Sequence, residues 1–438
     1  MTRHLLTPRL KPLSSRRSTL LSVLDVGTSK IVCLIAKLLP AESSDTLRGR
    51  THRVKILGIG HQRARGIKSG VVIDMEEAEK AIRMAVDAAE RMAGVEVESV
   101  IVNMTGGRLT SRQHAAQYTV GGKAVGQAEV QRCLDVATSH AARDGRALLH
   151  SLPTGFTLDS TTGIRDPKGM IGDELRCTLH NVSVEATAAR NLMLAIERCH
   201  LSVEAVVATP YASALSVLVD DEADMGAAVI DFGGGTTSVS VFNEGRLTHI
   251  DAIAVGGNHI TMDIARGLTT RVTDAERLKI VYGSCVASPS DIRETFSVVA
   301  AGDDGEQATH LPKSQLVRII KPRVEEILEL VHDRLKASGF AETASRRLIL
   351  TGGGSQLAGM TELARATMSS SVRIGRALGV QGLPESAKSP AYSASVGLLI
   401  YPQVAGLEHF AHGGQTLTKS TGTDGYVARV GRWLKESF

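Results

Sequence analysis

Residues 23–34 read V-L-D-V-G-T-S-K-I-V-C-L, and residues 229–242 echo them as V-I-D-F-G-G-G-T-T-S-V-S-V-F. In each copy an apolar strand ends in aspartate, a turn rich in Gly and Thr or Ser follows, and a second apolar strand returns. Glycine lets a turn adopt positive φ and approach a ligand closely, and the N–H groups of such a turn form a concavity that binds anions. The repetition predicts a phosphate-binding cleft between two related halves of the chain.

Asp25 and Asp231 end the first strand of each hairpin. A bare carboxylate is costly at the end of an apolar strand, and holding a hydrated divalent cation is a good reason to keep one there. We therefore expect both aspartates to bind Mg²⁺ through water. Lys30 closes the first turn and is placed to pair with a phosphate, although a lysine there is also commonly just solvated. The alternative is two ordinary hairpins whose glycines only shape the turns.

A third glycine loop follows the predicted strand 347–351, where Gly352, Gly353 and Gly354 precede Ser355 near a helix start. Such a helix start attracts phosphate or lets the backbone approach a flat base. The pattern G-x-x-x-x-G-K-[ST] is absent from the sequence, which excludes a P-loop enzyme of the usual form. No G-x-G-x-x-G follows the first strand either, which disfavours a dinucleotide-binding fold.

These three segments, in this order, resemble the phosphate-1, phosphate-2 and adenosine motifs of the actin-like ATPase superfamily. Within it the chain is most similar to the FtsA family of bacterial cell-division proteins, through L-D-V-G-T-S-K (24–30), S-V-I-V-N-M-T-G-G (99–107), V-G-G-N-H-I-T-M-D-I-A (255–265) and the tail. The resemblance covers about residues 20–402. It implies an α/β fold, duplicated and of ribonuclease H type, with two lobes around a nucleotide cleft. It also implies an inserted small α+β subdomain, called 1C, and a C-terminal amphipathic helix.

Composition and the resemblance together predict how the chain is divided. Apolar spacing predicts helices over 75–93 and 316–337, and residues 220–224 look like an acidic linker. The resemblance implies subdomain 1A (20–82, 183–222 and 385–402), subdomain 1C (83–182), subdomain 2A (223–265 and 331–384) and subdomain 2B (266–330). Composition and pattern predict a basic disordered tail (1–19), a flexible linker (403–423) and a membrane-targeting helix (424–438).

The resemblance implies two further groups of nucleotide-binding residues. Glu276 and Lys279 match positions that contact adenosine in related chaperones, and Gly256 and Gly257 match a glycine pair near the phosphates. A solvated i,i+3 pair on a helix is the alternative for Glu276 and Lys279. The residues predicted to bind nucleotide are Asp25, Gly27, Thr28, Ser29, Lys30, Asp231, Gly233, Gly234, Gly235, Thr236, Thr237, Gly256, Gly257, Glu276, Lys279, Gly352, Gly353, Gly354 and Ser355.

One position departs from most of the superfamily. Actins, MreB and the chaperones carry Gln or Glu in the turn that matches residues 208–212, where it orients the attacking water. Here the aligned residue is Thr209, which cannot act as a base, and the FtsA family shares this departure. We therefore expect ATP with Mg²⁺ to be bound but hydrolysed slowly or not at all, and we predict no catalytic residue. Another residue that takes over the water is the alternative.

The last fifteen residues, 424–438, form a separate pattern. On a helix, apolar residues would gather on one face and basic residues beside it, behind a linker rich in Gly, Ser and Thr. This pattern fits a helix that lies on an anionic membrane surface, and a helix docked on the body or on a partner is the alternative. The predicted membrane residues are Tyr426, Val430, Trp433, Leu434 and Phe438, flanked by Arg429, Arg432 and Lys435.

The resemblance also implies partners. The main partner of the FtsA family is the tubulin-like protein FtsZ, whose C-terminal peptide docks on subdomain 2B and usually mixes acidic and apolar residues. Basic side chains in 2B surround apolar Leu316, Ile319 and Ile320, and we predict contacts at Arg318 and Arg323. A solvated helix face explains these charges equally well. Self-assembly into a polymer, later division proteins bound through 1C, and a place on the cytoplasmic side of the inner membrane at the division site are also implied.

The composition narrows the classes of protein to which the chain can belong. The 438 residues are 43% apolar with a net charge of +4, which predicts sizeable cores and no general nucleic-acid binding. Five scattered cysteines without a C-x-x-C pair disfavour disulfides and a zinc site. The alternatives left open are a cell-shape or pilus-assembly actin homologue and a kinase of the same fold. A kinase would need a catalytic aspartate opposite the γ-phosphate, for which the sequence offers no convincing candidate.

Overall fold

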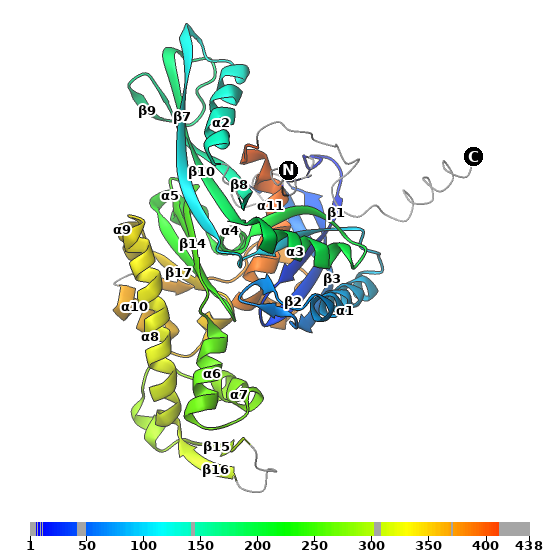
Figure 1. Cartoon of the computed structure of the whole chain (residues 1–438), viewed down its shortest axis with the longest axis vertical. Coiled ribbons are helices and arrows are strands. Elements are labelled where there is room, and N and C mark those ends of the chain that lie inside the picture. The colour runs from blue at the N-terminus through cyan, green and yellow to red at the C-terminus, as the bar shows by residue number, and fades with distance from the viewer. Residues whose placement is uncertain are drawn as a thin grey trace, which may run out of the picture.

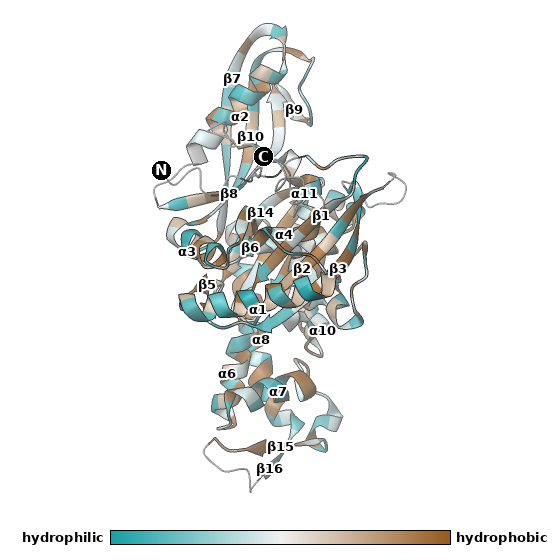
Figure 2. Ribbon diagram, turned by 90° about the vertical axis from the view of Figure 1, so that its right-hand side faces the viewer, coloured by the Kyte–Doolittle hydropathy of each residue, from teal (hydrophilic) through white to brown (hydrophobic). Residues whose placement is uncertain are grey.

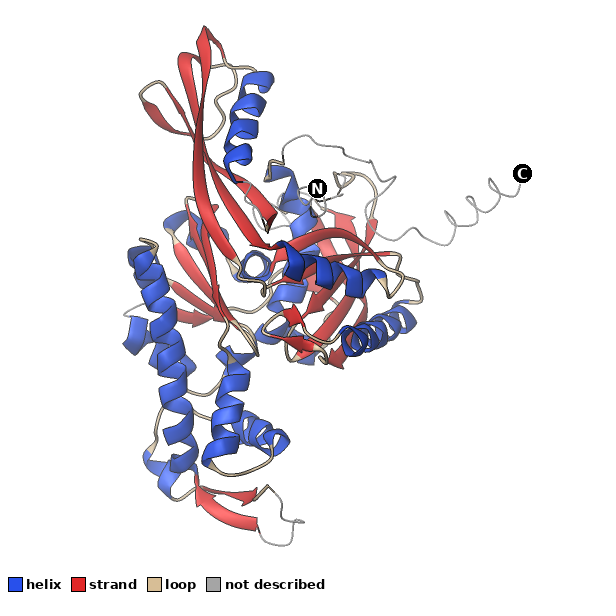
Figure 3. Cartoon of the chain, viewed as in Figure 1, coloured by secondary structure: helices blue, strands red, loops and turns tan. Residues whose placement is uncertain are grey.

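The computed structural model describes residues 6, 8, 10, 12–41, 50–141, 145–301, 308–368 and 371–410. Two lobes lie side by side in the middle of the molecule, each built on a sheet (Figure 1). A long strand-rich insert extends from one end and a mainly helical arm from the other, as the secondary-structure colours show (Figure 3). The predicted membrane residues, from Tyr426 to Phe438, lie outside the described residues.

The first sheet is built around the first Gly-rich hairpin. Its strand order is β11-β6-β1-β2-β3-β19, with β1 antiparallel to β2, β2 antiparallel to β3, and β1, β6 and β11 parallel to one another. The strands are β1 (Thr19–Val26), β2 (Lys30–Pro40), β3 (His52–Arg63), β6 (Ser99–Met104), β11 (Ser202–Ala208) and β19 (Val380–Gln381), and a separate small hairpin comprises β4 (Ile67–Lys68) and β5 (Val71–Val72).

Helix α1 (Met75–Ala93) covers this sheet and confirms the spacing prediction. Asp74 caps its first turn and Gly94 ends it in the left-handed conformation. The helix lies so close to β3 that a Cβ added at Gly60 would lie 1.7 Å from the carbonyl oxygen of Ala85. Figure 2 shows apolar colour along β2 and β3 and more hydrophilic colour on the outer face of α1.

The second sheet repeats the pattern of the first. It runs β18-β17-β12-β13-β14, with β12 antiparallel to β13, β13 antiparallel to β14, and β12, β17 and β18 parallel. This confirms the duplicated α/β fold predicted from the two hairpins. The strands are β12 (Ala227–Phe232), β13 (Thr237–Asn243), β14 (Arg246–Ile253), β17 (Leu348–Thr351) and β18 (Val372–Ile374).

Two buried helices, α4 (Thr209–Val217) and α11 (Ser393–Val404), pack against each other between the sheets. A Cβ added at Gly397 would lie 1.7 Å from the carbonyl oxygen of Ala212, so only glycine permits this approach. The remaining helices of the two lobes are α3 (Ala186–Glu197), α5 (Asp220–Met225), α9 (Ala341–Arg346) and α10 (Met360–Met368).

The prediction of an acidic linker at residues 220–224 is wrong, because these residues belong to helix α5. Glu222 is buried there and accepts a hydrogen bond of 2.7 Å from Arg373 Nε. A run of acidic residues suggests a segment exposed to solvent. Here Arg373, 151 residues away, pairs with Glu222 and allows its carboxylate to be buried.

The insert comprises β7 (Thr110–Ala124), α2 (Gln127–Ala141), β8 (Arg146–Leu158), β9 (Thr161–Ile164) and β10 (Ile171–Glu185). It continues the second sheet, since β7 pairs with β14 through Thr110 and Asp251. The predicted small α+β subdomain is therefore present, but residue 83 does not separate it from the first lobe. Helix α1 is one continuous element packed on β2 and β3, and β6 belongs to the first sheet.

The arm at the opposite end contains α6 (Gly257–Gly267), α7 (Val272–Tyr282), the hairpin β15 (Thr295–Val299) and β16 (Ala308–Pro312), and α8 (Lys313–Ala337). Helix α8 crosses the predicted boundary between 2B and 2A at residues 330 and 331, so it joins the arm rigidly to the second lobe. None of the helices in the described parts of the chain is long and apolar enough to cross a membrane.

Candidate functional site

A cavity of about 770 Å³ lies between the two lobes, where both Gly-rich hairpins end. The start of α6, helix α7, the loop after β17 and the start of α11 complete its wall. Fifteen predicted residues line it: Asp25, Gly27, Thr28, Ser29, Lys30, Asp231, Gly233, Gly234, Thr236, Gly257, Glu276, Lys279, Gly352, Gly353 and Gly354.

The two hairpin turns meet tip to tip. A Cβ added at Gly234 would lie 1.9 Å from Ser29 Oγ, and one added at Gly235 would lie 2.6 Å from Thr28 Cγ2. Any other residue type at these two positions would displace the side chain of Ser29 or Thr28 in the opposite turn. The glycines therefore set how closely the lobes approach each other.

Asp25 and Asp231 are the buried carboxylates of the cleft, only 6% and 9% exposed. Asp25 accepts hydrogen bonds of 2.6 Å from Ser395 Oγ and from Asn103 Nδ2, and Asp231 accepts one from Ser213 Oγ. Burial raises the pKa of Asp25 and raises that of Asp231 to about 6. Neither carboxylate forms a salt bridge with a described residue. Two desolvated carboxylates held by neutral donors are the arrangement that a hydrated divalent cation would complete.

Lys30 lies beside these carboxylates. Burial lowers its pKa to about 8, while the charges of Asp25 and Asp231 oppose that change. Its ammonium group lies 3.4 Å from the centre of the Tyr392 ring, a cation–π contact that holds the side chain in the cleft. The lysine therefore keeps most of its positive charge at neutral pH, as a phosphate ligand requires.

Glu276 and Lys279 line the cleft from helix α7. Lys279 Nζ lies 2.7 Å from Glu276 Oε2, 2.8 Å from Thr261 Oγ1 and 3.1 Å from the Gly257 carbonyl oxygen. The lysine side chain is 12% exposed, so it is not a solvated surface lysine. The pair ties α7 to the first turn of α6.

Four predicted residues lie behind the lining. Thr237 Oγ1 donates to the Val255 carbonyl oxygen at 2.8 Å, and Ser355 Oγ donates to that of Gly352 at 2.7 Å. Both hydroxyls are used within the protein and shape the turns. Gly235 and Gly256 permit close backbone approach, since a Cβ at Gly256 would lie 2.5 Å from the Gly233 carbonyl oxygen.

Thr209 stands at the start of α4 and lines the cleft. Its hydroxyl is bonded to Thr105 Oγ1 and lies 3.1 Å from Asn103 Nδ2. His61 also lines the cleft, and burial together with the charge of Lys30 lowers its pKa. His61 is therefore a neutral base in the cleft, and it was not predicted from the sequence.

The residues that hold the carboxylates are Asn103, Ser213 and Ser395, none of which was predicted from the sequence. Across the cleft, Asn258 Oδ1 accepts a hydrogen bond from Ser29 Oγ, and it was not predicted either. Asn103 carried a usable signal, because an amide within the apolar strand 99–104 needs buried partners. Ser213 and Ser395 lie on two buried helices and carried no signal of their own.

The predicted partner residues lie on α8, away from the cleft. Arg323 Nε forms an ion pair of 2.5 Å with Asp263 Oδ2 and also pairs with Glu326. Arg318 is exposed and makes no ion pair with a described residue. Leu316 and Ile320 are fully buried in the protein's own core, so these two apolar side chains are not open to a peptide.

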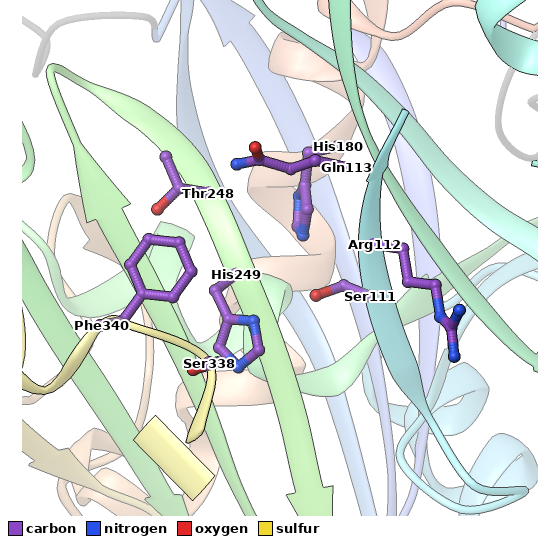
Figure 4. A pocket seen from close by; sticks show the side chains of 8 residues that line it. All are labelled: Ser111, Arg112, Gln113, His180, Thr248, His249, Ser338 and Phe340. Carbon is purple, nitrogen blue, oxygen red and sulfur yellow. The ribbon is translucent and has the colours of Figure 1, made fainter. Parts of the chain in front are cut away.

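A second, smaller cavity of about 270 Å³ lies where β7 parts from β14, beside the turn after α8. Figure 4 shows the His180 ring between the two strands and His249 beside Phe340. Both ring nitrogens of His180 lack a partner among the described residues, and burial lowers its pKa to about 3. None of the predicted site residues lines this cavity.

Comparison with known proteins identifies the family. The chain is 53% identical over 437 residues to the cell division protein FtsA of Agrobacterium fabrum, covering 99% of this chain and 98% of that one. The FtsA family includes this chain. A profile described as "Cell division protein FtsA" matches residues 228–397, and one described as "SHS2 domain inserted in FTSA" matches residues 106–183. The second match coincides with the insert and begins after β6.

More distant FtsA proteins agree. The FtsA of Rhizobium meliloti is 52% identical over 98% of both chains, and that of Escherichia coli K12 is 31% identical over 95% of this chain and 97% of its own. Among solved structures, the PilM-PilN type IV pilus biogenesis complex has a TM-score of 0.60 at 14% identity, covering 87% of this chain and 98% of that one. MreB 5 of Spiroplasma citri has a TM-score of 0.51 at 14% identity, covering 89% and 97%. These likenesses establish the actin-like fold.

Proposed function

We propose that this member of the FtsA family binds ATP with Mg²⁺ in the cleft, polymerises on the inner membrane face at the division site, and tethers the FtsZ ring there. The observation that carries the proposal is the opposition of two Gly-rich hairpins, each ending a strand in a buried aspartate. The solved MreB 5 of Spiroplasma citri is described as bound to AMPPNP, which agrees with a nucleotide in the same fold.

Bound Mg²⁺–ATP would supply a polyphosphate and a hydrated cation. The backbone N–H groups of residues 28–29 and 234–235 would bind the phosphates, and Lys30 would add a positive charge. The N–H groups of Gly27 and Gly233 already donate to the carbonyl oxygens of Lys30 and Thr236 and close the turns. Asp25 and Asp231 would hold the cation's water molecules. Glu276 and Lys279 would contact the nucleoside, and the glycine backbone of residues 352–354 would leave room for the base.

Slow hydrolysis is part of the proposal. Thr209 cannot take a proton from water, and its hydroxyl is already engaged with Asn103 and Thr105. His61 is the alternative base, since its lowered pKa keeps it neutral. If His61→Ala abolishes phosphate release and leaves ATP binding unchanged, then His61 is the base that activates the attacking water. This result would contradict the proposal that hydrolysis is slow because Thr209 replaces the usual base.

Membrane binding is assigned to residues 424–438. Burying a large apolar side chain contributes about 1.5–3 kcal/mol when complete, and ordering the peptide offsets much of that sum. One helix of this kind binds marginally, whereas a polymer of many protomers gains avidity. Nucleotide-dependent assembly and membrane attachment are therefore coupled.

The FtsZ contact is assigned to the arm, and the structure sharpens which residue to test. Arg323 is committed to Asp263, so Arg318 is the arginine free to steer an acidic peptide. We expect Arg318→Glu to weaken binding of the FtsZ C-terminal peptide, measured by fluorescence anisotropy. Reversing the charge of the nearby Lys321, which pairs with Glu325, is the matched control. Equal affinity in Arg318→Glu and wild type would refute the residue assignment.

Electron microscopy on lipid monolayers tests the whole proposal. Wild type is expected to form filaments on the monolayer with ATP and not without it. Trp433→Glu is expected to bind ATP normally but to leave the monolayer bare. Filaments that ignore ATP would contradict the nucleotide switch, and filaments of Trp433→Glu on the monolayer would contradict the membrane helix. Later division proteins bound through the insert are a further part of the proposal, testable by pull-down with and without residues 106–183.

A further inference from the structure

Glu408, among the last described residues, is held inside the protein. Its Oε1 atom lies 2.9 Å from Nδ1 of His150, and both side chains are fully buried. His150 belongs to β8, at the base of the insert. The chain therefore leaves α11 and returns to the point where the insert joins the two lobes.

The other ring nitrogen of His150 faces the first lobe. The backbone N–H of Ala208 donates to His150 Nε2 at 2.8 Å. A backbone N–H can only donate, so Nε2 is the accepting nitrogen and Nδ1 carries the hydrogen that points to Glu408. The carboxylate thus fixes the tautomer that receives the Ala208 N–H.

Ala208 precedes helix α4, whose first residue, Thr209, lines the cleft. Asn103 Nδ2 lies 3.1 Å from Thr209 Oγ1 and 2.6 Å from Asp25 Oδ1. One connected series of hydrogen bonds therefore runs from Glu408 through His150 and the 208–209 turn to Asp25. Its two ends are the candidate nucleotide cleft and the segment that leads toward the C-terminus.

Aromatic rings enclose this series. The His150 ring makes edge contacts with Tyr211 at 5.1 Å and Tyr401 at 5.7 Å between ring centres. Burial, and after it the charge of Glu408, raises the pKa of both tyrosines, so they remain neutral. A dry surrounding strengthens a hydrogen bond to a carboxylate and makes its loss costly.

The segment that carries Glu408 is held mainly by polar contacts. His409 donates its backbone N–H to the Ser151 carbonyl oxygen at 2.8 Å, and its Nε2 lies 2.9 Å from Asp135 Oδ1 of helix α2. Leu407 is 68% exposed and adds little apolar burial. A segment with few buried apolar contacts can release locally without unfolding the domain.

We propose that Glu408 and His150 are positioning residues for the cleft, and that they couple its occupation by nucleotide to the docking of residues 405–409. This inference rests on the proposed nucleotide binding. Docking holds the 208–209 turn in place through His150, and release removes the acceptor that fixes the ring. Coupling is reciprocal: if docking favours nucleotide, nucleotide favours docking by the same factor.

Two measurements on the full chain test this coupling. ATP affinity is measured with a fluorescent ATP analogue in the presence of Mg²⁺ for wild type, Glu408→Ala and the control Asp135→Asn. The control removes the charge from the other side-chain contact of the same segment, away from the cleft. Hydrogen exchange of wild-type peptides spanning 401–409 is measured with and without ATP, which requires no variant to fold.

We expect Glu408→Ala to lower ATP affinity about tenfold, within the usual range of coupling, while Asp135→Asn keeps wild-type affinity. ATP should slow exchange in residues 401–409 of wild type and not in Glu408→Ala. Binding of ATP by wild type with unchanged exchange in 401–409 overturns the coupling, as does equal affinity loss in both variants. Absence of ATP binding by wild type itself would instead overturn the proposed function.

Discussion

Ser29 Oγ donates a hydrogen bond to Asn258 Oδ1 across 3.2 Å and so joins the first hairpin turn to the start of α6 on the other side of the cleft. The two residues are 229 positions apart and belong to opposite walls of the cleft. Any rotation of the lobes changes this distance directly. The contact is therefore a sensitive marker of whether the cleft is open or closed.

Gly234→Ala should disable the cleft without unfolding the protein. The new methyl group would lie 1.9 Å from Ser29 Oγ, so the Ser29 hydroxyl must turn away and lose its bond to Asn258 across the cleft. We expect ATP affinity to fall at least tenfold, roughly 1.4 kcal/mol or more, and the melting temperature to change little. Gly155→Ala is the control, because its new Cβ would meet only Arg246 Nη1 at 3.6 Å. Wild-type affinity in Gly234→Ala would contradict the tip-to-tip arrangement.

Asp231→Asn should make the ligand-free protein more stable and at the same time weaken its binding of Mg²⁺ and ATP. Burial raises the pKa of Asp231 to about 6, so in the ligand-free protein its ionisation costs stability as pH rises from about 4 to about 6. A pKa change of one unit corresponds to about 1.4 kcal/mol, so at pH 7 the substitution should raise the free energy of unfolding by up to about 3 kcal/mol. Differential scanning fluorimetry should show a higher melting temperature without ligand.

The same variant should lose the stabilisation that Mg²⁺ and ATP give to wild type. A neutral amide does not hold a hydrated cation as a carboxylate does, and ligand binding stabilises only the state that binds it. A melting temperature that rises with Mg²⁺–ATP as much in Asp231→Asn as in wild type would show that this carboxylate has no part in cation binding.

Asn103→Ala should weaken the protein itself as well as the site. Its side chain accepts from the Val26 N–H at 2.7 Å and donates to Asp25 at 2.6 Å. Removing it leaves a buried donor and a buried carboxylate oxygen without partners, each costing about 1–3 kcal/mol. Urea unfolding should give a lower midpoint with an unchanged slope. A midpoint equal to that of wild type would contradict the assigned bonds.

His180 should make the protein sensitive to acid. Burial lowers its pKa to about 3, so between pH 6.5 and 3 the unfolded chain binds a proton that the folded chain does not. The contribution of His180 to the free energy of unfolding is therefore complete above pH 6.5. Below pH 6.5 it falls by about 1.4 kcal/mol per pH unit. His180→Gln should flatten the pH dependence of the urea midpoint over this range. An unchanged pH dependence in His180→Gln would contradict this role of the buried ring.

Much of the cleft was predictable because the parts proposed to bind phosphate are local. The two hairpins, the third glycine loop and the pair Glu276 and Lys279 are short segments whose turn chemistry is written in consecutive residues, and the structure brings all of them to one cavity. The division of the chain was less predictable. Helix α1 continues past residue 83 and α8 past residue 330, because burial of one helical face does not respect a subdomain boundary.

The repeated strand–turn–strand units and the positions of the two aspartates could be predicted from the sequence, since each rests on spacing within about a dozen residues. The groups that surround the aspartates depend on tertiary packing. Ser395 reaches Asp25 across 370 residues because α11 packs between the sheets, and Glu408 reaches His150 because the chain turns back after that helix. Contacts of this kind depend on how helices and sheets pack, and no local pattern encodes them.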